Sequence, residues 1–150
     1  MLDSRIPEHE KRFLEIMQKM DRLYEEFAKS KGMTYMSMTV LEAICAHPDN
    51  CTQKLISEAT HYPKQSVNLI VKSFLDSGYV TLTELPEDRR NKRIALTERG
   101  HAFAEETVGE LWAIDNNVSR QITPRQSEEL LRLLTIYTDA YEAGIHKAIR

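Results

Sequence analysis

The 150-residue sequence has little of what marks disulfide-rich, low-complexity or membrane-embedded proteins. Its 2 cysteines, Cys45 and Cys51, give no disulfide framework and fit a reducing compartment. No apolar run approaches the ~18 residues that a membrane span needs, and the first residues lack the anatomy of a signal peptide. With 41% hydrophobic and 29% charged residues, the chain is predicted to be one folded cytoplasmic domain without a membrane partner.

Patterns for catalysis and for metal binding are missing as well. The sequence has no Gly-rich phosphate loop, no nucleophile elbow and no coupled acid–base pair, and its 5 histidines lack metal-like spacing. We therefore expect a non-enzymatic protein with no catalytic residue, metal or cofactor. A redox- or metal-sensing variant stays open: Cys45 is predicted to be buried and inert, whereas Cys51, beside a helix start, is predicted to be the more reactive thiol.

The net charge is −3, so the overall excess of positive charge that would point directly to nucleic acid is absent. The distribution of charge is uneven, however. Residues 52–100 carry 8 basic and 6 acidic side chains, a net charge of +2, which leaves −5 for the rest of the chain. Clustering matters more than the total for a DNA-binding surface.

Residues 52–78 predict a helix-turn-helix. Thr52 can cap a short helix over 53–59, residues 61–63 form the turn, and a second helix runs from Lys64 to a stop at Gly78. Helical spacing places an apolar, core-facing set on the second helix: Val67, Ile70, Val71, Phe74 and Leu75. The opposite, outward face carries Gln65, Ser66, Asn68, Leu69, Lys72 and Asp76.

A β-hairpin, or wing, is predicted directly after this helix. Residues 79–85 and 93–97 have the composition of strands, and residues 86–92 form a basic tip between them. The run from Asp88 to Gly100 resembles the wing signature of the MarR family of bacterial transcription regulators, Asp-x-Arg followed by Leu-Thr-x-x-Gly. Residues 63–68 look like the start of that family's recognition helix, and the flanking helices extend the resemblance over nearly the whole chain.

Amphipathic helices flank the winged segment on both sides. Residues 8–31 form the first, and Ser37 or Thr39 caps a second helix that ends before Pro48. Thr97 caps a long helix to about residue 117, and Thr123 begins the last helix with a capping box. The apolar stripes of the first and last helices need another surface to cover them, and their central residues are Phe13, Ile16, Met17, Met20, Leu134, Tyr137, Tyr141 and Ile145.

The resemblance implies a mainly α fold with a small antiparallel β-hairpin, a winged helix-turn-helix flanked by long dimerisation helices. Residues 1–150 would form one domain, with residues 33–100 as the DNA-binding lobe and residues 1–32 and 101–150 as the helices that interleave with those of a second subunit. The implied function is a sequence-specific transcriptional regulator, a ligand-responsive homodimeric repressor. It would bind a palindromic operator in double-stranded DNA and associate with the nucleoid when bound.

The resemblance also implies roles for the wing. Arg90 would enter the minor groove, and Asp88 would hold its guanidinium in one orientation. The phosphate contacts would be Arg89, Lys92 and Arg93. The alternative is a merely solvated charged turn.

The second helix of the helix-turn-helix supplies the remaining predicted DNA contacts. Amides suit adenine, a hydroxyl suits base or phosphate, and lysines suit phosphates, which gives a set of Thr52, Lys64, Gln65, Ser66, Asn68 and Lys72. Leu69 departs from many family members, which have a basic or polar residue there. It either contacts a thymine methyl group or is neutral surface.

In the resembled family, small aromatic or phenolic ligands bind where the dimerisation helices meet the DNA-binding lobe. Such a junction here contains Met33, Tyr35, Met36 and Met38, whose soft side chains suit a promiscuous pocket. Ordinary packing is the alternative reading of these residues. A different class of function, a protein-interaction module that docks through its winged helix, would be distinguished by whether Arg89 and Arg90 are needed for DNA binding.

Overall fold

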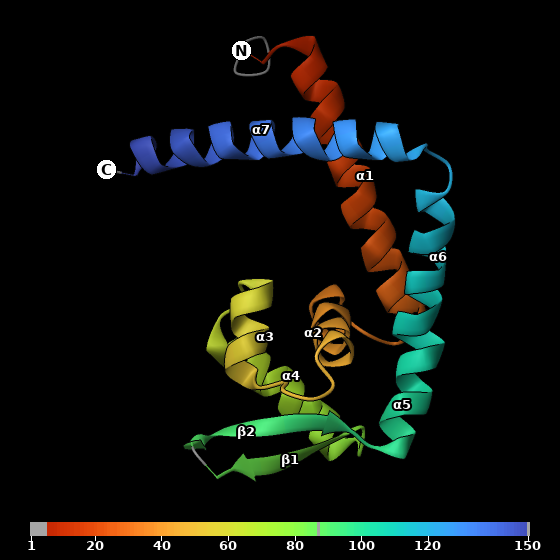
Figure 1. Cartoon of the computed structure of the whole chain (residues 1–150), viewed down its shortest axis with the longest axis vertical. Helices are drawn as coiled ribbons and strands as arrows, with labels where there is room; N and C mark the ends of the chain where they lie inside the picture. Colours follow the sequence, from red (N-terminus) through yellow and green to blue (C-terminus); the bar gives the residue numbers. More distant parts are fainter. Residues whose placement is uncertain (1–5, 87, 150) are drawn as a thin grey trace. The chain divides into compact units, whose positions relative to one another are not determined.

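The structure is a computed structural model that describes residues 6–86 and 88–149, with residues 88–90 described by their backbone alone (Figure 1). The elements in chain order are α1 (Glu8–Ser30), α2 (Tyr35–Ala46), α3 (Gln53–Thr60), α4 (Lys64–Asp76), β1 (Val80–Leu85), β2 (Asp88–Leu96), α5 (Glu98–Ala104), the π-helical segment η2 (Glu105–Gly109), α6 (Glu110–Ser119) and α7 (Pro124–Ala148). The predicted fold class, mainly α with an antiparallel hairpin, is confirmed. The chain forms two compact units, residues 1–110 and 111–150.

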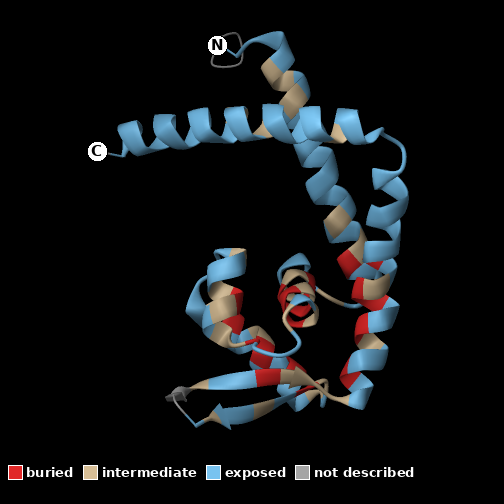
Figure 2. Ribbon diagram, in the orientation of Figure 1, coloured by how far each residue is buried: buried red, intermediate tan, exposed pale blue. Residues whose placement is uncertain are grey.

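The core of the first unit is built mainly from α2, α3, α4, the wing strands and the α5–η2 segment (Figure 2). Among its fully buried side chains are Met38, Val40, Leu41, Ile44, Ile56, Val67, Val71 and Ile94. Burial of one such side chain contributes roughly 1.5–3 kcal/mol, so this cluster holds the helices together. The predicted inner face of α4 is confirmed at Val67, Val71 and Phe74, but Leu75 is 39% exposed. Leu75 lies about 80° from Val67 around the helix, at the edge of the apolar stripe.

The junction between the wing and α5 explains the Leu-Thr-x-x-Gly run. Thr97 Oγ1 donates to the Gly78 carbonyl at 2.7 Å and accepts from the Gly100 N–H at 2.9 Å, which caps α5. A Cβ at Gly100 would lie only 1.9 Å from the Tyr79 carbonyl oxygen. Tyr79 also stacks on Phe103, with 4.3 Å between ring centroids. Sheet and helix therefore meet through a backbone contact that only glycine permits.

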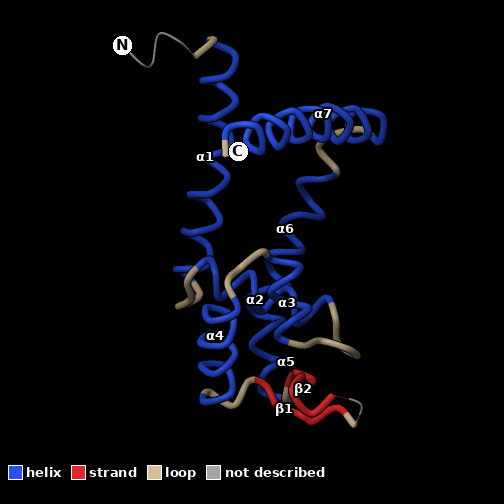
Figure 3. Tube along the Cα trace, turned by 90° about the vertical axis from the view of Figure 1, so that its left-hand side faces the viewer, coloured by secondary structure: helices blue, strands red, loops and turns tan. Residues whose placement is uncertain are grey.

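The wing strands pair in a regular antiparallel register as far as Glu84 opposite Lys92, after which Leu85 pairs with Asp88 (Figure 3, red). The prediction of a tip over residues 86–92 is therefore wrong, because the return strand begins at Asp88. Residues 89–91 form an irregularity between the two pairs. The basic residues of the wing thus lie within β2 and not in an open loop.

The wing is also attached to the segment that precedes α3. Thr52 forms an antiparallel β-bridge with Arg93, and the Ile94 N–H donates to the Cys51 carbonyl at 2.8 Å. These partners are about 40 residues apart in the sequence, so no local pattern indicates them. The bridge fixes the start of α3 against the middle of β2.

The second helix begins earlier than predicted. Thr34 is its N-cap, because its hydroxyl accepts the Ser37 N–H at 3.1 Å, and the helix starts at Tyr35. The prediction that Ser37 or Thr39 caps this helix is wrong: both lie within it, and Thr39 Oγ1 donates to the Tyr35 carbonyl at 3.1 Å. Threonine and serine make such bonds inside helices as well as at caps, so the sequence alone does not show which of Thr34, Ser37 and Thr39 is the cap.

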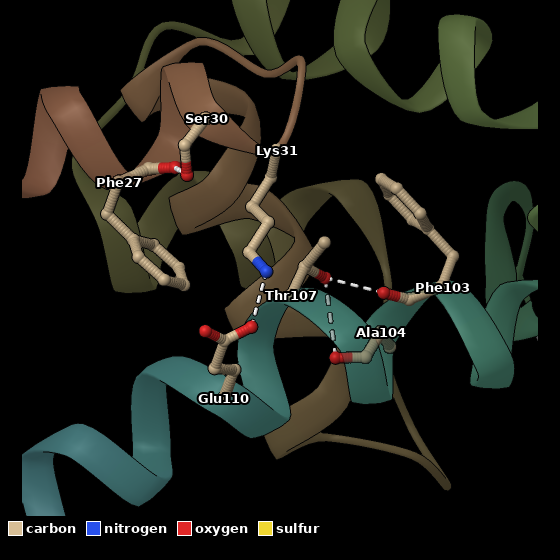
Figure 4. A network of polar contacts seen from close by, with 7 residues as sticks. All are labelled: Phe27, Ser30, Lys31, Phe103, Ala104, Thr107 and Glu110. Carbon is tan, nitrogen blue, oxygen red and sulfur yellow. Dashed lines mark hydrogen bonds and ion pairs between the residues drawn. The ribbon is translucent and has the colours of Figure 1, made fainter.

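The helix after the wing is capped by Thr97 as predicted but contains the π-helical segment η2. There Thr107, which is buried, donates through Oγ1 to the Phe103 carbonyl at 2.7 Å and to the Ala104 carbonyl at 3.3 Å (Figure 4). Just beyond it, the ammonium of Lys31 forms an ion pair with Glu110. The end of α1 is therefore held against the helix that follows the wing.

The capping box that begins α7 in the second unit is confirmed. Thr123 accepts the Gln126 N–H at 3.3 Å, and Gln126 Oε1 accepts the Thr123 N–H at 2.8 Å. No residue of α7 is buried, and its apolar stripe is open, with Tyr141 56% and Ile145 50% exposed (Figure 2). None of the helices among the described residues has the length and apolarity to cross a membrane.

Candidate nucleic-acid interface

A rigid turn sets the direction of α4 relative to α3. Thr52 caps α3 by accepting the Leu55 N–H at 3.1 Å, as predicted. At the other end of α3, His61 adopts a left-handed conformation with φ 57°, which reverses the chain. Ser57 Oγ donates to the Tyr62 carbonyl at 2.7 Å, so a side chain of α3 holds the turn from within.

The outer face of α4 brings together most of the predicted DNA-contacting residues. Lys64, Gln65, Asn68 and Lys72 are exposed, and Ser66 is half-buried. Leu69 lies among them with 68% of its surface exposed. Thr52 is half-buried at the cap of α3, where its hydroxyl is already engaged.

One side chain at this surface was not predicted from the sequence. Gln53 Nε2, at the start of α3, donates to Asn68 Oδ1 on α4 at 3.5 Å. The contact holds the Asn68 amide toward α3. It uses only the oxygen of that amide, so the two N–H donors of Asn68 are not used by it. A glutamine directly after a helix cap is the only sequence signal, and it does not specify this partner 15 residues away.

The described part of the wing presents basic side chains in a fixed register. Lys92 and Arg93 are exposed in β2 and lie opposite Glu84 and Thr83 of β1. The backbones of Asp88, Arg89 and Arg90 belong to the same strand, but their side chains lie outside the described residues. The wing and the outer face of α4 belong to one compact unit.

The prediction that Cys51 is the reactive thiol is wrong. Cys51 is fully buried, and its carbonyl accepts the Ile94 N–H of β2. Burial, and then the neighbouring Cys45, raise the pKa of the Cys51 thiol to about 11. Cys45 is half-buried, and burial followed by the charge of Glu42 raises its pKa to about 11 as well. A thiol that stays protonated at neutral pH is a poor nucleophile and metal ligand.

The residues predicted to line a ligand pocket differ in their surroundings. Met38 is 1% exposed in the core, whereas Tyr35 and Met36 are each 37% exposed and Met33 is half-buried. Tyr35 packs on Tyr24 of α1 with 5.7 Å between ring centroids. Burial, followed by nearby tyrosine and carboxylate groups, raises the pKa of Tyr35. Across residues 6–86 and 88–149, no group of three His, Cys, Asp or Glu side chains is placed to hold a metal ion.

Comparison with known proteins agrees with this arrangement. A family model described as MarR family matches residues 31–91, the segment from the end of α1 to the wing. The regulator SarZ of Staphylococcus epidermidis is 27% identical over 114 residues, which cover 75% of this chain and 76% of that protein. Residues 31–91 therefore belong to the MarR family. Another relative, the Escherichia coli regulator PrsX, is 33% identical over 86 residues, 53% of this chain and 49% of that protein.

Solved structures of MarR family regulators share the fold of this chain. A MarR family regulator from Neisseria meningitidis superposes with a TM-score of 0.76 at 21% identity and covers 91% of this chain and 96% of that one. Staphylococcus aureus MepR in its DNA-binding conformation gives a TM-score of 0.74 at 19% identity, with coverage of 89% and 98%. SarZ and PrsX are both described as HTH-type transcriptional regulators. This chain accordingly has the winged helix-turn-helix fold of MarR family regulators.

Proposed function

We propose that this protein is a dimeric, ligand-responsive repressor that reads a palindromic operator with α4 in the major groove. The outer face of α4 supports this most directly. Its exposed Gln65 and Asn68 can each form two hydrogen bonds to an adenine edge, and Lys72 on the same face can neutralise a phosphate. The opposite face of α4 is anchored by the buried Val67 and Val71, so the reading face is held rigidly outward.

The wing supplies the second contact in this proposal. Arg90 enters the minor groove, where a narrow A·T-rich sequence enhances the negative potential, and Asp88 orients its guanidinium by a bidentate bond. Lys92 and Arg93, which are exposed in β2, and Arg89 contact phosphates. The structural neighbour MepR has been solved as a MepR–DNA complex, with a TM-score of 0.68 to this chain.

Two copies of the chain associate in this proposal through α1 and α7. Ile16, Met17 and Met20 of α1 are between 43% and 61% exposed, so water contacts this apolar stripe in an isolated subunit. The other residues of the proposed dimer interface are Phe13 on α1 and Leu134, Tyr137, Tyr141 and Ile145 on α7. A twofold dimer carries two recognition helices about one helical turn (~34–36 Å) apart, which is the spacing of a palindromic operator.

Operator affinity falls in this proposal when a small aromatic or phenolic ligand binds near Met33, Tyr35, Met36 and Met38. The exposed ring of Tyr35 beside Tyr24 offers an aromatic surface at this position. Staphylococcus aureus MarR, with a TM-score of 0.68 to this chain, has been solved in complex with salicylate and kanamycin.

The test begins with selection of bound duplexes from a random pool, followed by titration of the selected operator. Gln65→Ala should relax base preference at particular positions, at a cost of ~1–3 kcal/mol per lost bidentate contact. Lys72→Ala should weaken all sequences alike and flatten the slope of log affinity against log salt by about 1 per protomer. Lys19→Ala, an exposed lysine on α1, is the matched control and should leave both unchanged. A wild type that enriches no duplex would refute the proposal.

A further inference from the structure

The outer face of α4 contains an exposed apolar side chain, Leu69, which cannot take part in hydrogen bonds to DNA. Leu69 is 68% exposed, although it lies in the middle of the helix and not at a frayed end. Among the described residues of this face, the others are polar or charged: Gln65, Ser66, Asn68, Lys72, Ser73 and Asp76. The exposed apolar residues of α1 form a continuous stripe, whereas Leu69 stands alone among polar neighbours.

Leu69 lies on the same side of α4 as Gln65, whose amide is predicted to contact a base. It lies one turn after Gln65, about 6 Å further along the helix axis and only about 40° away around it. Asn68 lies on the other side of Gln65, and its Oδ1 is held toward α3 by Gln53 at 3.5 Å. The centre of the face is therefore shared by Gln65 and Leu69, with Lys72 beyond them.

A leucine at this place complements one feature of the major groove. The base edges there display hydrogen-bond donors and acceptors, together with a single apolar group, the C5 methyl of thymine. Leucine can neither donate nor accept, so it would leave the polar edges of cytosine, guanine or adenine without a partner. Contact with the thymine methyl instead removes apolar surface of both groups from water.

We propose that Leu69 reads the C5 methyl group of a thymine in each half-site and thereby determines specificity for thymine at that position. The inference rests on the proposed function, because it requires α4 to lie in the major groove. It adds a residue that selects sequence by apolar contact beside residues that select it by hydrogen bonds.

The test replaces thymine with uracil in the selected operator, one position at a time and in both half-sites. Deoxyuridine pairs as thymidine does and lacks only the methyl group. At one thymine position in each half-site, the substitution should weaken wild-type binding by roughly 4-fold per half-site, the effect of one buried methyl group. Leu69→Ala should bind the thymine and uracil duplexes equally at that position.

Controls separate the inference from other effects of the substitution. Leu75→Ala removes another exposed leucine of α4, 39% exposed and outside the outer face, and should keep the wild-type ratio of thymine to uracil affinity. Gln65→Ala should lower base preference at a different position and also keep that ratio. Thermal unfolding of Leu69→Ala should match the wild type, since the side chain is mostly exposed.

The outcomes distinguish the two proposals. A wild type that enriches duplexes but binds every uracil-substituted operator as tightly as the original overturns the role of Leu69 and leaves the proposed function standing. Sensitivity to uracil that persists unchanged in Leu69→Ala also overturns it. A wild type that enriches no duplex overturns the proposed function and this inference together.

Discussion

Gly100 is the glycine at which an added Cβ would meet the closest contact. The Tyr79 carbonyl oxygen and carbon would lie 1.9 Å and 2.8 Å from a Cβ there, and both are backbone atoms that cannot rotate away. Gly100→Ala should therefore destabilise the protein by about 1–3 kcal/mol or more, measured by denaturant unfolding. Gly144→Ala is the matched control. Apart from its chain neighbours and the adjoining backbone of its own helix, no atom of the described residues lies within 4 Å of the added Cβ, so the substitution should be neutral or stabilise α7 by about 0.5–1 kcal/mol. Equal effects at both sites would contradict the close contact.

Cys51 gives a prediction about pH. Burial raises the pKa of its thiol to about 11 from the 9.0 of a free thiol, so the folded chain holds a proton there that the unfolded chain releases first. This contribution to stability is complete below pH 9 and is lost as the pH rises toward 11. In a Cys45→Ser background, alkylation of Cys51 at pH 8 should be at least ~100-fold slower in the folded protein than in urea. Rapid alkylation of the folded protein at pH 8 would contradict the burial of Cys51.

The secondary-structure elements could largely be predicted from sequence where the signals are local. The helix-turn-helix follows from the cap at Thr52, the turn at 61–63 and the spacing of Val67, Val71 and Phe74. The capping box at Thr123 likewise requires only neighbouring residues.

The features that were not predicted depend on partners distant in the chain or on choices between similar residues. The buried Cys51 pairs through its carbonyl with Ile94 of β2. The N-cap of α2 is Thr34, and the helix begins at Tyr35. Several hydroxyl residues lie close together there, and the local sequence pattern does not show which of them is the cap. The contact of Gln53 with Asn68 across the two helices is of the same long-range kind.

The wing carries the prediction that best separates specific recognition from simple charge attraction. Arg90→Ala should lower operator affinity by roughly 1–3 kcal/mol, the range of a specific arginine contact. Asp88→Ala should cause part of the same loss even though it makes the wing more positive, because the guanidinium loses its orientation. Charge attraction alone predicts the opposite sign for Asp88→Ala.

A double-mutant cycle at fixed salt decides between these accounts. If Asp88 acts by orienting Arg90, its effect should largely vanish in the Arg90→Ala background, so the two losses are strongly non-additive. Tighter binding by Asp88→Ala, or fully additive losses, would show that the wing is only a solvated basic strand.

At the scale of the whole molecule, the open apolar stripes predict self-association. Ile16→Glu places a carboxylate in the proposed interface and should weaken the dimer at least ~100-fold in sedimentation equilibrium, since an unpaired buried charge costs about 3–5 kcal/mol. Gln18→Glu adds the same charge on the opposite, exposed side of α1 and should not change association. A wild type that is monomeric at micromolar concentration would refute the proposed dimer.

The central claim is that two recognition helices read one face of a symmetric operator. It is tested most directly by changing the spacing of the half-sites in the selected duplex. An insertion of about half a helical turn, roughly five base pairs, places the second half-site on the opposite face of the DNA. We predict that affinity then falls to that of a duplex with a single half-site. Affinity that is unchanged by the insertion would contradict the account.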